Sequence, residues 1–184
     1  MKTVFFDVDT QLDFLFPGGA LYVPGAEKIA PTLSALTSFA AQHGVRVLST
    51  LDSHTENDPE FSVWPPHCVL GTHGHQKYSA TLLPSPSQQT LFHKNTIEFF
   101  STPGLRELLD ALKADRFIVY GLVTEYCVQA ALFGLLARQV EVGLVTDAIR
   151  CLHPEEERAV LARFTGAGGR LLTWADLNSD QSFR

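Results

Sequence analysis

Three side chains that can take part in nucleophilic chemistry each follow a short apolar run of this chain. Asp9 ends the run VFFDVD, Lys94 ends the run TLFHK, and Cys127 comes shortly after the run RFIVY. A cysteine near the start of a helix is favoured as a thiolate, and the unpaired N–H groups there can receive an oxyanion. A lysine nearby can pair with Asp9 and stabilise negative charge. Taken singly, Cys127 also fits ordinary core packing and Lys94 an exposed strand end.

A second group of polar residues follows the apolar run VLSTL and contains Asp52, His54, Glu60 and His67. Carboxylate oxygens and imidazole nitrogens together suit Zn²⁺, Mn²⁺ or Fe²⁺. Asp52 and His54 are two residues apart, so both side chains point to one side of an extended segment. The spacing alone leaves two interpretations open, a divalent metal site or a polar loop that contains these residues by chance.

These side chains need elements that bring several strand ends together. Apolar runs without polar alternation are typical of strands buried on both faces, as in a parallel sheet. Six such runs occur, at Thr3–Val8, Val45–Leu51, Thr90–His93, Arg116–Tyr120, Val140–Thr146 and Arg170–Thr173. Helical periodicity lies between them, at Ala26–His43, Pro103–Ala114, Glu125–Arg138 and Glu155–Phe164.

The alternation of strands and helices predicts an α/β fold with a doubly wound, mainly parallel six-stranded sheet and helices on both faces. We expect a single domain over residues 1–184. In such sheets, ligands bind beyond the carboxyl ends of the strands, where the polar residues above are placed. The exception to the alternation is Asp52–Gln88, which lacks clear periodicity, and loops of that length are usually functional or disordered.

Composition and charge argue against several classes of protein. The formal net charge of −6 and the lack of a basic stripe argue against a nucleic-acid partner. No apolar run approaches the roughly 18–20 residues of a membrane span. Three scattered cysteines, Cys68, Cys127 and Cys151, suggest reduced thiols, of which Cys68 and Cys151 are expected to be structural. We therefore expect a cytoplasmic enzyme without a membrane partner.

The chain resembles the isochorismatase-like cysteine hydrolases over nearly its whole length. The segments that carry the resemblance, in order, are DTQLDF (9–14), PGGAL (17–21), WPPHCVLGT (64–72), Lys94 and GLVTEYCV (121–128). The opening FDVDTQL also resembles the first motif of the aspartate-nucleophile phosphatases. That class would place Thr or Val at Gln11, and it would leave Cys127 and the Asp52–His67 group without a role.

The resemblance implies that Asp9, Lys94 and Cys127 form a catalytic triad. Within the superfamily, the Asp-x-His pair with two later ligands resembles the metal site of nicotinamidases. This implies one divalent metal ion, with zinc preferred over manganese or iron, and a site that consists of Asp52, His54, Glu60 and His67. The family commonly has His where Glu60 stands.

The implied activity is metal-dependent hydrolysis of nicotinamide to nicotinate and ammonia through a thioester at the cysteine. The alternative substrate is another small amide, ureido or carbamoyl compound. Two other hypotheses stay open, a metallohydrolase in which metal-activated water attacks, and a binding protein without catalysis. Relatives commonly form dimers or tetramers, so a homo-oligomer is expected.

The resemblance also assigns the loop around the cysteine. The backbone N–H groups of Val123 and Cys127 would receive the oxyanion, and a non-proline cis peptide would fall at Val123–Thr124. Phe14, Trp64 and Tyr126 would form the aromatic walls of a pocket for a flat ring. The sequence departs from the family at Leu12, where Asn is frequent, and at Glu125, where Asp is frequent.

Overall fold

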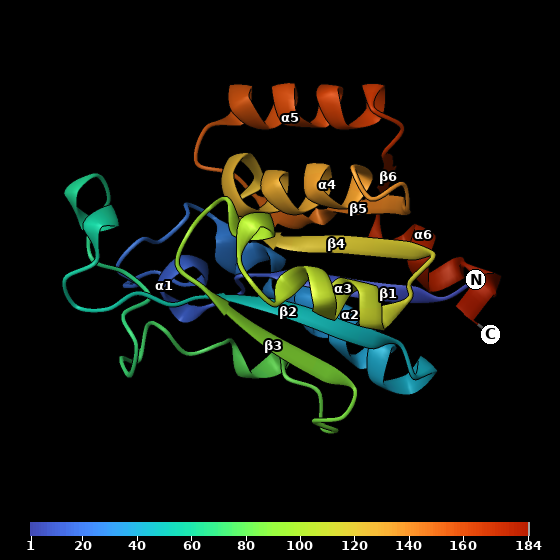
Figure 1. The fold of residues 1–184 in the computed structure, drawn as a ribbon, viewed down its shortest axis with the longest axis horizontal. Coiled ribbons are helices and arrows are strands. Elements are labelled where there is room, and N and C mark those ends of the chain that lie inside the picture. Colours follow the sequence, from blue (N-terminus) through green and yellow to red (C-terminus); the bar gives the residue numbers. More distant parts are fainter. Residues whose placement is uncertain (184) are drawn as a thin grey trace.

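The computed structural model describes residues 1–183 and contains one six-stranded sheet in which every pair of neighbouring strands is parallel (Figure 1). The strand order is β3-β2-β1-β4-β5-β6. The bounds are β1 Thr3–Val8, β2 Arg46–Asp52, β3 Gln89–Lys94, β4 Arg116–Leu122, β5 Glu141–Arg150 and β6 Arg170–Leu172. The predicted α/β sheet is confirmed. Strand β5 extends four residues beyond its predicted end because it continues to pair with β4 as far as Arg150.

Helices cover both faces of the sheet, as predicted. Their bounds are α1 Leu12–Leu15, α2 Ala30–His43, α3 Leu105–Leu112, α4 Gln129–Leu136, α5 Pro154–Gly166 and α6 Trp174–Ser179. The short helices α1 and α6 have no counterpart in the prediction, since neither is long enough to show a helical period. Helix α4 begins later than predicted because a wide turn at Thr124–Val128 precedes it. Within residues 1–183, no helix is long and apolar enough to cross a membrane.

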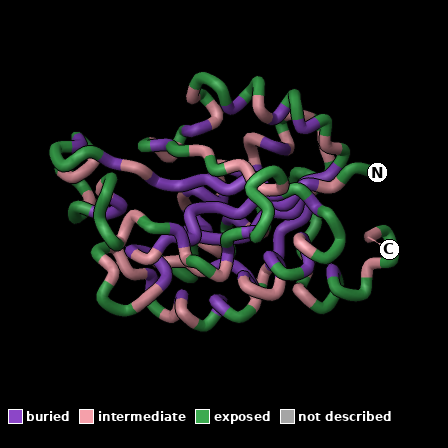
Figure 2. The backbone as a smooth tube through the Cα atoms, turned by 90° about the horizontal axis from the view of Figure 1, so that it is seen from below, coloured by how far each residue is buried: buried purple, intermediate pink, exposed green. Residues whose placement is uncertain are grey.

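The core consists of two apolar layers, one on each side of the sheet. Successive side chains of a strand point to opposite faces, so Phe5 of β1 packs in the layer of α2 while Phe6 packs in the layer of α3, α4 and α5. Figure 2 shows the central strands buried along their length and the exposed residues on the surrounding loops and helices. Both faces of the sheet are therefore covered over the central strands, whereas the edge strands β3 and β6 remain partly exposed.

The chain leaves β1 in one direction along the sheet and returns to place β4 on its other side. This reversal between β1 and β4 is where open α/β sheets form a ligand crevice. The two strands approach closely there, because a Cβ on Gly121 would lie 2.0 Å from the carbonyl oxygen of Val8. Gly121 also has φ +120°, which favours glycine.

Most of the long segment between β2 and β3 lies beyond the carboxyl ends of the strands, together with α1, before the chain returns to the start of β3 (Figure 1). Its regular structure is limited to short 3-10 turns at Pro59–Ser62 and Ser79–Thr81. Isolated bridges join His54 to Val69 and Gln11 to Lys77. The segment is thus tied to the end of β1 and to itself, which makes it a wall over the strand ends.

Candidate active site

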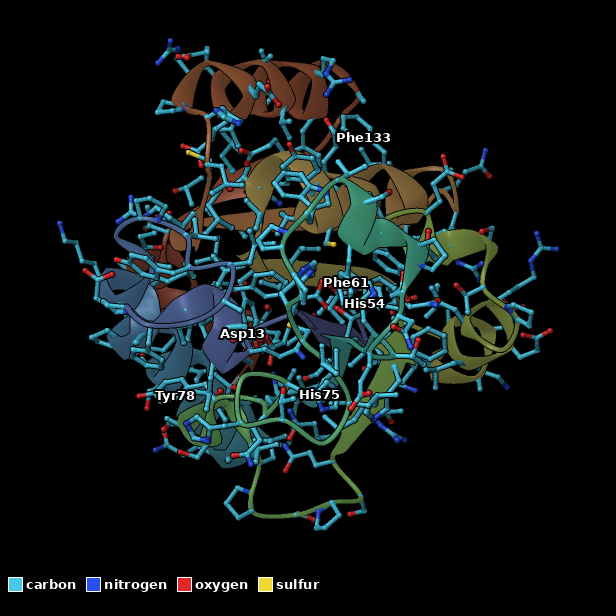
Figure 3. All side chains as sticks on the ribbon, turned by 90° about the vertical axis from the view of Figure 1, so that its left-hand side faces the viewer. Asp13, His54, Phe61, His75, Tyr78 and Phe133 are labelled. Carbon is cyan, nitrogen blue, oxygen red and sulfur yellow. The ribbon has the colours of Figure 1, made fainter. Side chains whose placement is uncertain are left out.

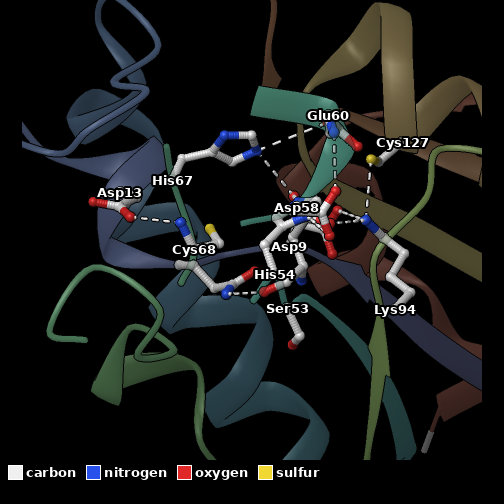
Figure 4. Close-up of polar contacts among 12 residues, drawn as sticks. Asp9, Asp13, Ser53, His54, Asp58, Glu60, His67, Cys68, Lys94 and Cys127 are labelled. Carbon is white, nitrogen blue, oxygen red and sulfur yellow. Dashed lines mark hydrogen bonds and ion pairs between the residues drawn. The ribbon is translucent and has the colours of Figure 1, made fainter. Parts of the chain in front are cut away.

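The face at the carboxyl ends of the strands is turned toward the viewer in Figure 3, with His54 and Phe61 near its middle. The predicted triad meets beneath this face. The Nζ of Lys94 lies 2.8 Å from Oδ2 of Asp9 and 3.3 Å from Sγ of Cys127 (Figure 4). Asp9 follows β1, Lys94 ends β3, and Cys127 follows β4. The long lysine side chain spans the intervening strand β2, whose Asp52 also pairs with it at 3.0 Å.

Burial and charge together set the protonation of the triad. Burial alone would lower the pKa of Lys94, but the nearby Asp9, Cys127 and Asp52 raise it well above its ordinary value, so the lysine stays charged. Burial raises the pKa of Asp9, which the charge of Lys94 opposes. Burial also raises the pKa of the Cys127 thiol well above its ordinary value. The resting cysteine therefore keeps its proton, and attack requires a base at the site.

Asp9 is placed to be that base. It is fully buried, and its Oδ1 accepts a hydrogen bond of 2.7 Å from the hydroxyl of Thr50. Its backbone φ is +48°, in the left-handed region that few non-glycine residues adopt. Backbone conformations of this kind are concentrated at functional sites.

The loop that carries the nucleophile forms as β4 ends. The N–H groups of Tyr126 and Val128 both donate to the carbonyl of Val123 at 3.1 Å, which closes the wide turn around Cys127. The cis peptide bond lies at Leu122–Val123, so the prediction of Val123–Thr124 is wrong by one residue. The difference follows from the end of the sheet, because Leu122 is the last residue of β4 to pair with β5.

Three predicted metal ligands converge beside the triad. Oδ2 of Asp52 lies 3.0 Å from Nε2 of His54 and 3.2 Å from Nε2 of His67. The potential ligand atoms of the three buried residues lie within 4.8 Å of one another. The second ring nitrogens are also held, with Nδ1 of His54 at 3.0 Å from Asp58 and Nδ1 of His67 at 2.8 Å from the carbonyl of Pro65. Metal-binding histidines usually have such outer partners, so this donor set fits a divalent cation.

Charge at this group also suits a cation. Burial would raise the pKa of Asp52, but Lys94 and the two histidines hold it well below its ordinary value. The carboxylate is therefore ionised. Burial would lower the pKa of His54, yet the hydrogen bond and charge of Asp52 raise it to about 9. The carboxylate of Asp52 thus favours positive charge at the His54 imidazole, either as a bound proton or as a bound metal ion.

Glu60 lies beside this group rather than within it. Its Oε1 is 4.0 Å from Nε2 of His67, and its side chain is 23% exposed. It stands on the 3-10 turn Pro59–Ser62, whose start is capped by Asp58 through a 3.0 Å bond from the Glu60 N–H. The candidate ligands that converge are therefore Asp52, His54 and His67, with Glu60 at the edge.

A cavity opens between the triad and the metal-ligand group. All three predicted aromatic residues, Phe14, Trp64 and Tyr126, contribute to its wall. The rings of Trp64 and Tyr126 meet edge to face at 5.4 Å between centroids. The other lining residues are Asp9, Leu21, Asp52, Glu60, His67, Ile97, Leu122, Val123, Cys127 and Leu152. Thr124 is outside this wall and donates its hydroxyl to Glu157 at 3.0 Å instead.

Sequence reasoning missed the role of Gln11, which clamps the backbone of Asp52. The Gln11 Nε2 donates to the carbonyls of Asp52 and His75, both at 2.8 Å, and Oε1 accepts the Asp52 N–H at 2.7 Å. It also missed Lys77, which is buried and paired with Asp7. Gln11 belongs to a recognised motif, whereas Lys77 lies in a segment whose sequence shows no period, so no signal pointed to its partner.

A similarity to known proteins covers nearly the whole chain. The isochorismatase domain family model matches residues 3–176. The nicotinamidase of Escherichia coli is 28% identical over 95% of this chain and 96% of its own length. The nicotinamidase/pyrazinamidase of Mycobacterium tuberculosis is 32% identical over 66% of this chain and 72% of its own length.

Solved structures show the same fold. The pyrazinamidase of Pyrococcus horikoshii, in complex with zinc, superposes with a TM-score of 0.84 at 29% identity, over 94% of this chain and 99% of that one. The nicotinamidase/pyrazinamidase of Bacillus subtilis gives a TM-score of 0.85 at 24% identity, over 93% of this chain and 99% of that one. The arrangement of strands, helices and loops is thus shared across most of each chain.

Proposed function

Since the chain belongs to the isochorismatase family, we propose that it is a metal-dependent nicotinamidase that forms a thioester at Cys127. The family and its nicotinamidase relatives make the protein a hydrolase of amide carbon–nitrogen bonds. Beyond this general activity, we propose the substrate nicotinamide, a bound divalent metal ion and a covalent step at Cys127. The observation that carries this proposal is the contact of Lys94 with both Asp9 and Cys127, at 2.8 and 3.3 Å, beneath a cavity whose wall includes Asp9, Cys127 and two of the three metal-type donors, Asp52 and His67.

In the first half of the reaction, Asp9 takes the proton of the Cys127 thiol, and the sulfur attacks the carboxamide carbon. A carbon–sulfur bond forms as the carbonyl electron pair moves to oxygen, where the N–H groups of Val123 and Cys127 receive the charge. When the carbon–nitrogen bond breaks, Asp9 returns the proton to the leaving ammonia. Lys94 stays charged and offsets the negative charge that moves between carboxylate and sulfur.

In the second half, Asp9 takes a proton from water, which attacks the thioester carbon. The carbon–sulfur bond then breaks, the thiolate regains a proton, and the carboxylate product leaves. Thr124 belongs to the same loop, and its bond to Glu157 fixes that loop against α5. The burial of the triad strengthens each of these charge interactions.

Asp52, His54 and His67, with Glu60 at the edge of the cavity, would hold one divalent ion. Zinc is the first candidate from the donor types, with manganese and iron as alternatives. A bound ion of this kind supplies a Lewis-acidic anchor for a ring nitrogen of the substrate. The cavity wall of aromatic and aliphatic side chains suits a flat heteroaromatic ring beside that anchor.

The charges of the cavity favour a neutral carboxamide over ureido or carbamoyl acids. In the described part of the chain, the wall includes no arginine or lysine that would bind a substrate carboxylate. Lys94 lies beneath the wall and is already paired with Asp9 and Asp52. An anionic substrate would therefore meet Asp9, Asp52 and Glu60 with the proposed metal ion as the one unpaired cation of the described wall, whereas nicotinamide carries no charge.

The test is ammonia release by metal-loaded protein from nicotinamide, compared with a carbamoyl and a ureido acid of similar size. We expect rapid release from nicotinamide and at least tenfold lower kcat/KM for the two anionic compounds. Release from the anionic compounds alone would contradict the nicotinamide assignment while keeping the amidohydrolase. Release from none of a broad set of small amides would favour a binding protein.

A further inference from the structure

Glu125 is a buried carboxyl group that the reaction above does not use. It lies two residues before Cys127 in the wide turn, and it is 5% exposed. Its Oε1 accepts two backbone hydrogen bonds of 2.8 Å, from the N–H groups of Leu152 and His153. Its Oε2 is buried without a hydrogen-bond partner among residues 1–183. All of the polar contacts of this carboxyl group are thus directed at one short piece of chain.

That piece connects β5 to α5 and contributes Leu152 to the cavity wall. The other lining residues come from the ends of β2 and β4 and from the segments that follow β1, β2, β3 and β4. Leu152 is the one lining residue from the β5–α5 connection in the described part of the chain. The turn around Cys127 holds this connection at two places, through Glu125 at its middle and through Thr124 at Glu157 in the first turn of α5.

We propose that Glu125 is a positioning residue that holds Leu152 against the cavity. In this way it sets how strongly the site discriminates against substituents on the substrate ring. The inference rests on the proposed function, because this selectivity is measured with nicotinamide and its ring-methylated derivative. Aspartate is shorter by one carbon–carbon bond of about 1.5 Å, so it does not reach both N–H groups with the connection in place. Two ordered N–H groups would lose their acceptor, and Leu152 would be free to move from the wall.

The experiment compares Glu125→Asp, Glu125→Gln, Leu152→Ala and the double variant Glu125→Asp/Leu152→Ala. The ratio of kcat/KM for nicotinamide to that for a ring-methylated nicotinamide is measured for each. We expect Glu125→Asp to lower the ratio about tenfold, mainly through KM, since one methyl group in an apolar pocket is worth about 10- to 200-fold. Glu125→Gln keeps an oxygen acceptor at the position of Oε1, so this variant is expected to have the wild-type ratio.

The double variant separates positioning from general damage. If Glu125 acts through Leu152, the double variant has the ratio of Leu152→Ala alone, because the wall is already gone. Effects of the two substitutions that multiply would overturn the proposal. An equal loss for both substrates in Glu125→Asp, with the ratio unchanged, would also overturn it.

Two further measurements keep the inference independent of folding and of turnover. In the wild-type protein, the amides of Leu152 and His153 should exchange hydrogen at least a hundredfold more slowly than an unstructured chain, and unprotected amides would overturn the proposal.

Pyridine-3-carboxaldehyde and a ring-methylated form probe the cavity without hydrolysis. The Cys127 sulfur adds to the aldehyde carbon, the thiol proton moves to the oxygen, and nothing leaves. If wild-type protein discriminates between the aldehydes, Glu125→Asp loses that discrimination, and nicotinamide is not hydrolysed, the proposed function fails and the role of Glu125 stands.

Discussion

Replacement of Gln11 by alanine tests whether the backbone clamp on Asp52 organises the metal site. The substitution removes three hydrogen bonds, two of them buried with Asp52 and one part-buried with His75. At about 1 kcal/mol each, their loss costs about 3 kcal/mol, divided between folding stability and metal binding. Outer partners of metal ligands typically contribute 10- to 100-fold in affinity. We therefore expect the zinc Kd to rise by about that factor.

Gln88→Ala is the matched control, because Gln88 also bridges two carbonyls, those of Ala40 and Val45, but lies away from the site. Zinc Kd is measured by competition with a fluorescent chelator, and stability by thermal unfolding of the metal-free proteins. Gln88→Ala should lower Tm and leave the zinc Kd within about twofold. An unchanged Kd in Gln11→Ala, or equal changes in both variants, would refute the reasoning.

Three other perturbations address the buried charges. Lys77→Met leaves Asp7 buried without its partner and should destabilise the protein by about 3–5 kcal/mol in urea unfolding, with partial recovery in Asp7→Asn/Lys77→Met; no recovery would contradict a charge effect. Lys94→Met should lower kcat/KM for nicotinamide at least a hundredfold while the protein stays folded by circular dichroism, and near-normal activity would remove the lysine from the triad. Burial and then Glu157 raise the pKa of Cys151 to about 11, so its alkylation should rise about tenfold per pH unit from pH 8 to 10. Glu157→Gln lowers that pKa and should accelerate alkylation at pH 8, measured in a Cys127→Ala background; an unchanged rate would contradict the assignment.

The sequence predicted the inner strands well because most of their residues are buried on both faces and therefore form nearly continuous apolar runs. The central strand β1 has the predicted bounds, Thr3–Val8. Ends that depend on tertiary pairing were less well predicted, as with β5, which continues to Arg150 beside β4. The start of α4 was missed for a related reason, since the wide turn around Cys127 is set by contacts with Val123 rather than by a helical period.

The predicted triad could be assigned from the sequence through its resemblance to the family, and each member stands at or just after the end of a parallel strand. The supporting residues could not, because their partners are distant in the chain. Gln11 and Asp52 are 41 residues apart, and Asp7 and Lys77 are 70 apart. Leu152 comes from yet another strand end, and its place in the cavity depends on a backbone hydrogen bond to Glu125. Such contacts carry no local pattern.

The most direct test of the account is nicotinamide hydrolysis by Cys127→Ala protein that holds its metal and melts like the wild type. A small residue at this buried position leaves Asp9, Lys94 and the donors of Asp52, His54 and His67 in place. The account predicts that ammonia release falls to background, because the nucleophile is lost. Activity that persists in Cys127→Ala and disappears on chelation would contradict it and would identify a metal-activated water as the nucleophile.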